Sequence, residues 1–164
     1  MELFRSNENI EIVIERYKKM VFGIAFSYTK NRNDADDVFQ EVFLTYYRKN
    51  VAFNDEEHRK AWLIRVTINC SKRVISSVWK KVVPFEETAD SDFQFEIEEQ
   101  NVIFNALSEL PHKYRIVLYL FYFEEMSIIE ISKSLKIKEG TVKVQLNRGR
   151  NLAREKLKGE YFNE

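Results

Sequence analysis

The fold is indicated most clearly by the segment SIIEISKSLKIKEGTVKVQLNRGRNLAREKLK, residues 127–158. It opens with Ser127 followed three residues later by Glu130, a capping-box pattern in which both side chains accept free backbone N–H groups at a helix start. We therefore expect a short helix that carries Ile131 and Leu135. After a few further residues the pattern predicts a final helix, whose inner face holds Val142, Leu146, Gly149 and Leu152.

Two short helices joined by a few residues, the second of them basic, are typical of a helix-turn-helix. The outer face of the final helix is mostly polar and presents Thr141, Lys143, Val144, Asn147 and Arg148. An α-helix fits the major groove of DNA, where Arg or Lys binds guanine and Asn binds adenine. Arg150, Arg154 and Lys156 lie further along and suit phosphate contacts. The alternative is a basic surface helix in a bundle that binds no DNA.

Two more helices complete a predicted four-helix domain over residues 97–164. One begins near Ile97, is amphipathic and ends before Pro111, because the residue before a proline disfavours helix. Its apolar face holds Val102, Ile103, Ala106, Leu107 and Leu110. The other is strongly apolar and is expected over residues 113–123.

A linker is predicted over residues 80–96. Helical periodicity is lost there, and the chain from Pro84 to Gln100 carries seven acidic residues and no basic one. We consider two roles for this acidic segment: a solvated spacer between basic domains, or a mimic of a polyanion.

Residues 1–79 favour a bundle of three long helices. The first is expected over residues 9–29, where apolar residues recur at three- and four-residue spacing. The second is expected to begin at the acidic run 34–37, whose charges suit the positive end of a helix dipole, and to end near residue 50. The third is expected over residues 55–79, where basic residues alternate with apolar ones.

Composition agrees with an all-α protein of two small domains, because four glycines and two prolines supply little of the turn chemistry that sheets need. The net charge is zero, but residues 133–158 contain nine basic and two acidic side chains. Phosphate binding responds to such local potential. The longest apolar run, residues 116–123, is much shorter than the roughly 20 residues that span a bilayer. With no visible secretory signal and a lone Cys70, we expect a cytoplasmic protein without membrane insertion.

Three motifs, in order along the chain, carry a resemblance to a known family. The first is DADDVFQEVF at residues 34–43, and the second is AWLIRV at residues 61–66 with Asn69. The third combines Leu110-Pro111, SIIEI at 127–131 and GTVK at 140–143, followed by Leu146, Arg148 and Arg150. In this order, the three motifs resemble the polymerase-binding helix, the promoter-melting helix and the promoter-reading domain of extracytoplasmic-function (ECF) sigma factors.

The resemblance implies a sigma factor that binds core RNA polymerase and promoter DNA and directs promoter recognition, melting and transcription initiation. It implies polymerase binding by Asp37, Gln40 and Glu41. It implies capture of the single strand of the minus-ten element, with bases stacked on a ring and phosphates held by cations, by Trp62, Arg65, Asn69, Lys72 and Arg73. It implies contact with the minus-thirty-five duplex by Lys143, Val144, Asn147 and Arg148, with phosphate contacts by Arg115, Thr141 and Arg150. An anti-sigma factor is an expected partner, and the resemblance implies no cofactor.

Some of these positions also have purely structural interpretations. Core packing is the favoured role for Trp62, and helix capping accounts for Asp34 as well as partner binding does. The linker resembles a segment that threads the RNA channel of the polymerase. Lys136 stands where the family usually has glycine. A left-handed backbone there would cost a non-glycine residue about 1 kcal/mol, which favours an altered turn.

Three other classes of protein are alternatives to a sigma factor. A one-component helix-turn-helix regulator, acting without binding core polymerase, would need a ligand or dimerisation domain that residues 1–79 do not suggest. An enzyme is not expected, because the chain has His58, His112 and Cys70 but no glycine-rich phosphate loop or nucleophile elbow. Both histidines are expected at the surface, and no metal site is expected from the acids at 34–37. The third alternative is a helical adaptor without DNA-dependent activity.

Overall fold

The computed structural model describes residues 4–5, 9–80, 106–107 and 109–162. The chain forms two compact units, Met1–Asp92 and Phe93–Glu164. The all-α fold of two helical domains is confirmed. The predicted acidic linker lies almost entirely outside the described residues, so its boundaries stay a prediction.

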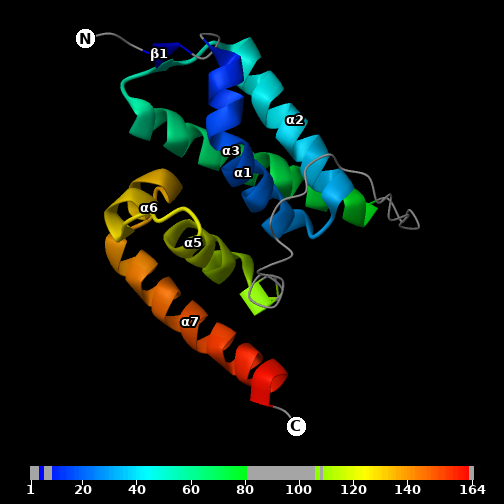
Figure 1. Ribbon diagram of the computed structural model, residues 1–164, viewed down its shortest axis with the longest axis vertical. Helices are drawn as coiled ribbons and strands as arrows, with labels where there is room; N and C mark the ends of the chain where they lie inside the picture. The colour runs from blue at the N-terminus through cyan, green and yellow to red at the C-terminus, as the bar shows by residue number, and fades with distance from the viewer. Residues whose placement is uncertain (1–3, 6–8, 81–105, 108, 163–164) are drawn as a thin grey trace. The chain divides into compact units, whose positions relative to one another are not determined.

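The first unit is a bundle of three helices, each packed against the other two (Figure 1). They are α1 (Ile10–Thr29), α2 (Arg32–Lys49) and α3 (Glu56–Lys80). Apolar side chains of this unit form its core, and the largest fully buried ones include Val21, Phe22, Ile24, Val38, Tyr46, Phe53, Leu63 and Ile64. The three-helix prediction is therefore confirmed.

The junction between α1 and α2 is tighter than the sequence suggested. Helix α2 begins at Arg32, two residues before the acidic run, because the Asn31 side chain accepts a hydrogen bond from the Asp34 N–H at 3.1 Å. Lys30 takes a left-handed conformation with φ 56° and donates its N–H to the Phe26 carbonyl. Only two residues outside the helices, Lys30 and Asn31, thus reverse the chain, and Asp34 lies in the first turn of α2 as expected from the helix dipole.

A short strand pair, absent from the sequence-based prediction, closes one end of this unit. Strand β1 (Phe4–Arg5) pairs antiparallel with β2 (Ala52–Phe53), with Phe4 opposite Phe53. Two-residue strands carry too little periodicity to be recognised in a sequence. The pairing matters because β2 leads directly into α3 and its Phe53 side chain is fully buried.

In the second unit, α5 (His112–Tyr122), α6 (Ile128–Leu135) and α7 (Glu139–Phe162) all contact one another. The predicted capping box is confirmed: Ser127 Oγ accepts the Glu130 N–H at 3.1 Å, and Glu130 accepts the Ser127 N–H at 3.4 Å. Most of the predicted fourth helix lies outside the described residues. Of that helix, Ala106 and Leu107 are helical and buried.

The turn between α6 and α7 keeps a left-handed residue in spite of its lysine. Lys136 has φ 56° and ψ 46° and donates its N–H to the Ser132 carbonyl. The altered turn that the missing glycine favoured is therefore not observed. The next residue, Ile137, also donates its N–H to Ser132, at 3.1 Å, and the Ser132 hydroxyl donates to the Ile137 carbonyl at 2.5 Å. These three bonds hold the backbone in the strained conformation.

The inner face of α7 is rotated slightly from the predicted one. Val142, Leu146 and Gly149 are buried as expected, but Leu152 is exposed and Ala153 is buried in its place. The next buried residue after Gly149 therefore lies four positions further along the helix and not three. Both spacings belong to a helix face, and the sequence favoured Leu152 because its side chain is the larger apolar one.

Candidate nucleic-acid and polymerase interfaces

The outer face of α7 is open along the helix-turn-helix. Thr141, Lys143, Val144, Asn147 and Arg148 are all exposed, while Val142 and Leu146 on the opposite side are almost completely buried. This helix therefore presents a stripe of cationic, amide and small apolar side chains, which is the mixture that reads base edges in a major groove. The predicted set is brought together on one helix face, and its binding to DNA stays a prediction.

Close packing of α7 against α5 fixes the position of that face. At Gly149 an added Cβ would lie 2.8 Å from Leu118 Cδ1 and 3.2 Å from Tyr114 Cβ. Non-bonded contacts of a Cβ atom are essentially never as short as 2.8 Å, so any larger residue at this position would force Leu118 to shift. Leu118 is itself fully buried. The sequence placed Gly149 on the inner face, but it did not reveal which helix needed the space.

Arg115 and Arg150, both predicted to contact phosphate, occupy different environments. Arg115 is only 3% exposed, and its guanidinium donates to the Leu110 carbonyl at 3.3 Å and contacts His112 Nδ1 at 3.0 Å. This geometry gives Arg115 an internal role at the start of α5, so phosphate contact by Arg115 stays a prediction that the structure does not support. Arg150 is half-buried and lies against Phe121 and Tyr122.

The basic side chains of α3 form a second exposed stripe. Asn69, Lys72 and Arg73 are exposed and Arg65 is half-buried, and their spacing places them on the same side of α3 as Trp62. Trp62 is half-buried, with its ring centroid 5.9 Å from that of Tyr46 and 5.8 Å from that of Phe53. The favoured interpretation of Trp62 as a packing residue is therefore supported.

Helix α2 presents the residues predicted to bind polymerase. Asp37 and Gln40 are exposed, and Glu41 is half-exposed beside them. The same face continues with two apolar side chains that the sequence analysis did not select, Leu44 (50% exposed) and Tyr47 (55% exposed). Their spacing from Gln40, four and seven residues, was the signal available in the sequence. An exposed face with apolar residues beside polar ones is typical of a protein-binding surface.

Two carboxyl groups at the start of α2 have raised pKa values. Partial burial raises the pKa of Asp34 and of Asp36, and the nearby Asp37 carboxylate raises both further. Arg32 partly offsets this effect on the pKa of Asp36. A cationic partner would relieve the repulsion among these three carboxylates, so this end of the helix is suited to a basic protein surface.

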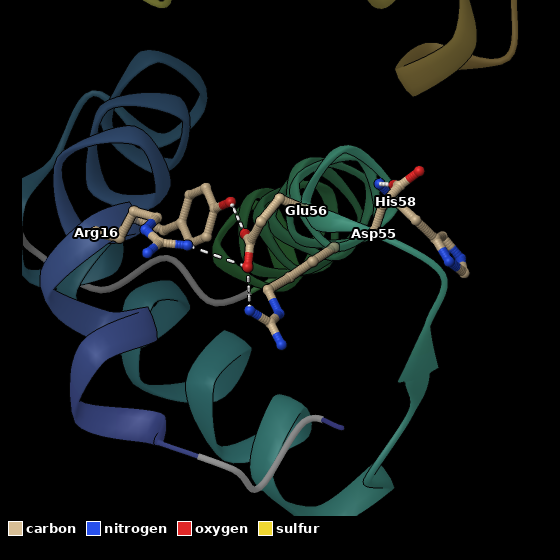
Figure 2. Close-up of polar contacts among 6 residues, drawn as sticks. Arg16, Asp55, Glu56 and His58 are labelled. Atoms are coloured by element: carbon tan, nitrogen blue, oxygen red, sulfur yellow. Dashed lines mark hydrogen bonds and ion pairs between the residues drawn. The ribbon is translucent and has the colours of Figure 1, made fainter. Parts of the chain in front are cut away.

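A polar cluster that the sequence analysis missed joins α1 to α3 (Figure 2). The Glu56 carboxylate accepts a hydrogen bond from the Tyr17 hydroxyl at 2.6 Å, pairs with Arg16 at 3.0 Å and also binds Arg59. Burial, followed by the bond to Glu56, raises the pKa of Tyr17 above its ordinary value, which keeps the hydroxyl protonated as a donor. The cluster connects residues 39 positions apart, so local sequence patterns carry no sign of it.

His58 has a structural role instead of the plain surface position expected for it. Asp55 Oδ1 accepts the His58 N–H at 2.7 Å, and His58 Nδ1 accepts the Asn54 N–H at 3.1 Å. The imidazole ring also packs edge-on against Phe53, with centroids 5.2 Å apart. These contacts cap the start of α3 and connect it to β2.

The described part of the chain contains neither a candidate membrane-spanning helix nor a candidate metal cluster. None of its helices combines the length and apolar character that crossing a bilayer requires. In the same residues, no cluster of three or more His, Cys, Asp or Glu side chains is placed to ligand a metal ion.

The two units correspond to the two halves of one known class of protein. The Sigma-70 region 2 family model matches residues 13–81, and the Sigma-70, region 4 model matches residues 100–152. This is the sigma-70 class, in which α2 and α3 fall in the first region and the helix-turn-helix in the second.

Curated relatives identify the family within that class. The chain is 30% identical to the ECF RNA polymerase sigma factor SigM of Bacillus subtilis over 159 residues, covering 93% of this chain and 94% of the relative. It is 28% identical to SigW of the same organism, covering 89% and 87%. The chain therefore belongs to the ECF sigma factor family.

Solved structures share its fold. The sigma factor RpoE, in a co-crystal structure with the anti-sigma factor NepR from Bartonella quintana, matches with a TM-score of 0.72 and 19% identity, covering 92% of this chain and 98% of that one. CnrH, in complex with the cytosolic domain of CnrY, matches with a TM-score of 0.71 and 20% identity, covering 94% and 92%.

Proposed function

We propose that this protein is a cytoplasmic, non-enzymatic initiation factor that binds core RNA polymerase and directs it to promoters. The observation that carries the proposal is the open outer face of α7, where Lys143, Val144, Asn147 and Arg148 lie exposed while Val142 and Leu146 lock the helix into its unit. A helix held in this way can enter a major groove without changing its own fold.

Each of three surfaces has its own partner in this proposal. The outer face of α7 reads the duplex of the upstream, minus-thirty-five element. The basic stripe of α3 holds one strand of the downstream, minus-ten element, with Trp62 as the ring nearest to the bases. The face of α2 from Asp37 to Tyr47 binds the polymerase, with Leu44 and Tyr47 as apolar contacts and Gln40 and Glu41 as polar ones.

The free chain is proposed to bind promoter DNA weakly. Each basic stripe neutralises only a few phosphates, and such contacts weaken steeply as salt is added. Binding to polymerase fixes the two units at one separation, so that the second DNA contact forms at high effective concentration. We propose residues 1–79 and 97–164 as the two functional domains with residues 80–96 as their linker. An anti-sigma factor is proposed as a regulatory partner.

Reconstitution with purified core polymerase tests this function. The expected result is transcription from a discrete set of promoters, mapped by sequencing the 5′ ends of the transcripts. Tight, specific promoter binding by the free chain at physiological salt, with no gain on adding polymerase, would indicate a one-component regulator instead.

A matched pair of variants tests the polymerase-binding face. Leu44→Ala removes an exposed apolar side chain from that face, and Ile12→Ala removes one of similar exposure (54%) from α1. We expect Leu44→Ala and Gln40→Ala each to weaken polymerase binding about tenfold or more, and Ile12→Ala to leave it unchanged. Equal effects of Leu44→Ala and Ile12→Ala would refute the assigned face.

A further inference from the structure

Arg150 is held in place by two aromatic residues at the end of α5. Its Nε donates a hydrogen bond to the Tyr122 hydroxyl at 2.6 Å. Its guanidinium carbon lies 5.3 Å from the centre of the Phe121 ring and 5.6 Å from that of Tyr122. The two rings are themselves packed edge to face, 5.0 Å apart. An arginine with four rotatable side-chain bonds is thereby confined to a narrow set of positions.

The geometry leaves one edge of the guanidinium for a ligand. A guanidinium has five N–H donors, of which one lies on Nε and four on the two terminal nitrogens. Among the described residues, the hydrogen bond to Tyr122 uses Nε, and the centre of the Phe121 ring lies 5.3 Å from the guanidinium carbon. The edge formed by the two terminal nitrogens is the one that binds a phosphate through two parallel hydrogen bonds.

We infer that Tyr122 is a positioning residue that orients Arg150 toward a DNA phosphate beside the groove that α7 enters. The inference rests on the proposed function, because it assumes that α7 contacts DNA. Arg150 lies three positions after Asn147 and two after Arg148, so a phosphate on the flank of their base contacts is within its reach. Pre-orientation means that the side chain loses less freedom when it binds.

Tyr122 is suited to removal without loss of the fold. It is the last residue of α5 and is 52% exposed, so its hydroxyl contributes little to the core. Tyr122→Phe keeps the ring and its contact with the cation but removes the acceptor of the hydrogen bond. Tyr114→Phe is the matched control, because Tyr114 lies on the same helix and is half-buried. The cation beside its ring is Lys113, whose Nζ lies 5.0 Å from the ring centre, and not Arg150.

The test is a double-mutant cycle on the polymerase-bound protein. Binding to a promoter duplex that contains the upstream element is measured by fluorescence anisotropy for wild type, Tyr122→Phe, Arg150→Ala and the double variant. We expect Arg150→Ala to weaken binding about tenfold and to lower the slope of log affinity against log salt by about one. Tyr122→Phe is expected to weaken binding about threefold when Arg150 is present and to have no effect when it is absent, with thermal unfolding unchanged. Tyr114→Phe is expected to bind as wild type.

Three results would overturn the inference. An equal loss from Tyr122→Phe with and without Arg150 would mean that Tyr122 contacts DNA itself. Tighter binding by Tyr122→Phe would mean that the hydroxyl holds Arg150 away from the phosphate. Wild-type affinity in Arg150→Ala would mean that Arg150 contacts no phosphate. In each case the wild-type complex would still initiate transcription, whereas failure of the proposed function would remove promoter-specific initiation by the wild type.

Discussion

Glu41 and Arg73 form an ion pair between α2 and α3, with Arg73 Nη2 donating to Glu41 Oε1 at 2.9 Å. The pair connects the proposed polymerase-binding face to the basic stripe proposed to hold single-stranded DNA. The same nitrogen of Arg73 lies 3.1 Å from Cys70 Sγ. The two predicted surfaces of the first unit therefore meet at one contact, although each was assigned from a separate motif.

Removing this ion pair should hardly affect the stability of the first unit. Both side chains are about half exposed or more, and exposed pairs contribute roughly 0–1 kcal/mol. We expect Arg73→Ala to lower the free energy of unfolding by less than about 1 kcal/mol, and Glu56→Gln, which disturbs three donors, to lower it by about 1–2 kcal/mol. Both tryptophans belong to the first unit, so tryptophan fluorescence during urea unfolding measures that unit. A larger loss from Arg73→Ala than from Glu56→Gln would contradict this ranking.

Two glycines of α7 should respond oppositely to alanine. Gly149→Ala places a methyl group against Leu118 and Tyr114, so the second unit should lose about 1–3 kcal/mol through overpacking. Gly140 has nothing within 4 Å of an added Cβ, and Gly140→Ala should stabilise the helix by about 0.5–1 kcal/mol. Thermal unfolding followed by circular dichroism compares the two variants. Stabilisation by Gly149→Ala would show that α5 moves away at no cost.

Lys136→Gly should stabilise the helix-turn-helix. The left-handed backbone at Lys136 costs a side-chain-bearing residue about 1 kcal/mol, and glycine avoids that cost. Lys133 is a matched control, because it is an exposed lysine inside α6, where glycine should destabilise by about 1 kcal/mol. Amide hydrogen exchange in α6 and α7 measures both changes. Slower exchange in Lys136→Gly and faster exchange in Lys133→Gly are expected, and the same direction in both would refute the argument.

The carboxylates at the start of α2 should make stability depend on pH. Burial and the Asp37 charge raise the pKa values of Asp34 and Asp36, so the folded state binds these protons more tightly than the unfolded chain. Their contribution therefore favours folding at low pH and is lost as the pH rises from about 4, the ordinary value, through the raised pKa values. Asp37→Asn should lower the pKa values of Asp34 and Asp36 and so reduce the stability that is lost as the pH rises. NMR titration of the carboxyl carbons in the full chain measures the two pKa values. Unchanged pKa values in Asp37→Asn would exclude the Asp37 charge as a cause of the shifts.

Arg148 and Arg154 should affect promoter binding differently. Arg148 is on the face proposed to read bases, so Arg148→Ala should relax selectivity at one position of the upstream element, at a cost of about 1–3 kcal/mol for the preferred base. Arg154 is exposed further along α7, so Arg154→Ala should weaken binding to all sequences alike. Initiation from a library of randomised upstream elements distinguishes the two. If Arg148→Ala leaves initiation at every promoter unchanged, the assigned face of α7 is wrong.

Features that depend on residues close together in the chain could be predicted from the sequence. The capping box at Ser127 and Glu130, the apolar stripe of the first helix and the position of the helix-turn-helix follow from spacings of three or four residues, because such spacings place side chains on one face of a helix. The outer face of α7 was predicted for the same reason, because knowing the inner residues of a helix fixes the outer ones.

Contacts between residues far apart in the chain could not be predicted from the sequence and became visible in the folded structure. The partners Tyr122 and Arg150 are 28 positions apart, and Glu41 and Arg73 are 32 apart. The packing of helices against each other also decided that Arg115 is buried and that Ala153, not Leu152, faces the core. Local spacing determines which side chains share a face, but the angle and separation of two helices depend on the fit of whole surfaces. That fit is a property of the folded chain and appears in no single stretch of its sequence.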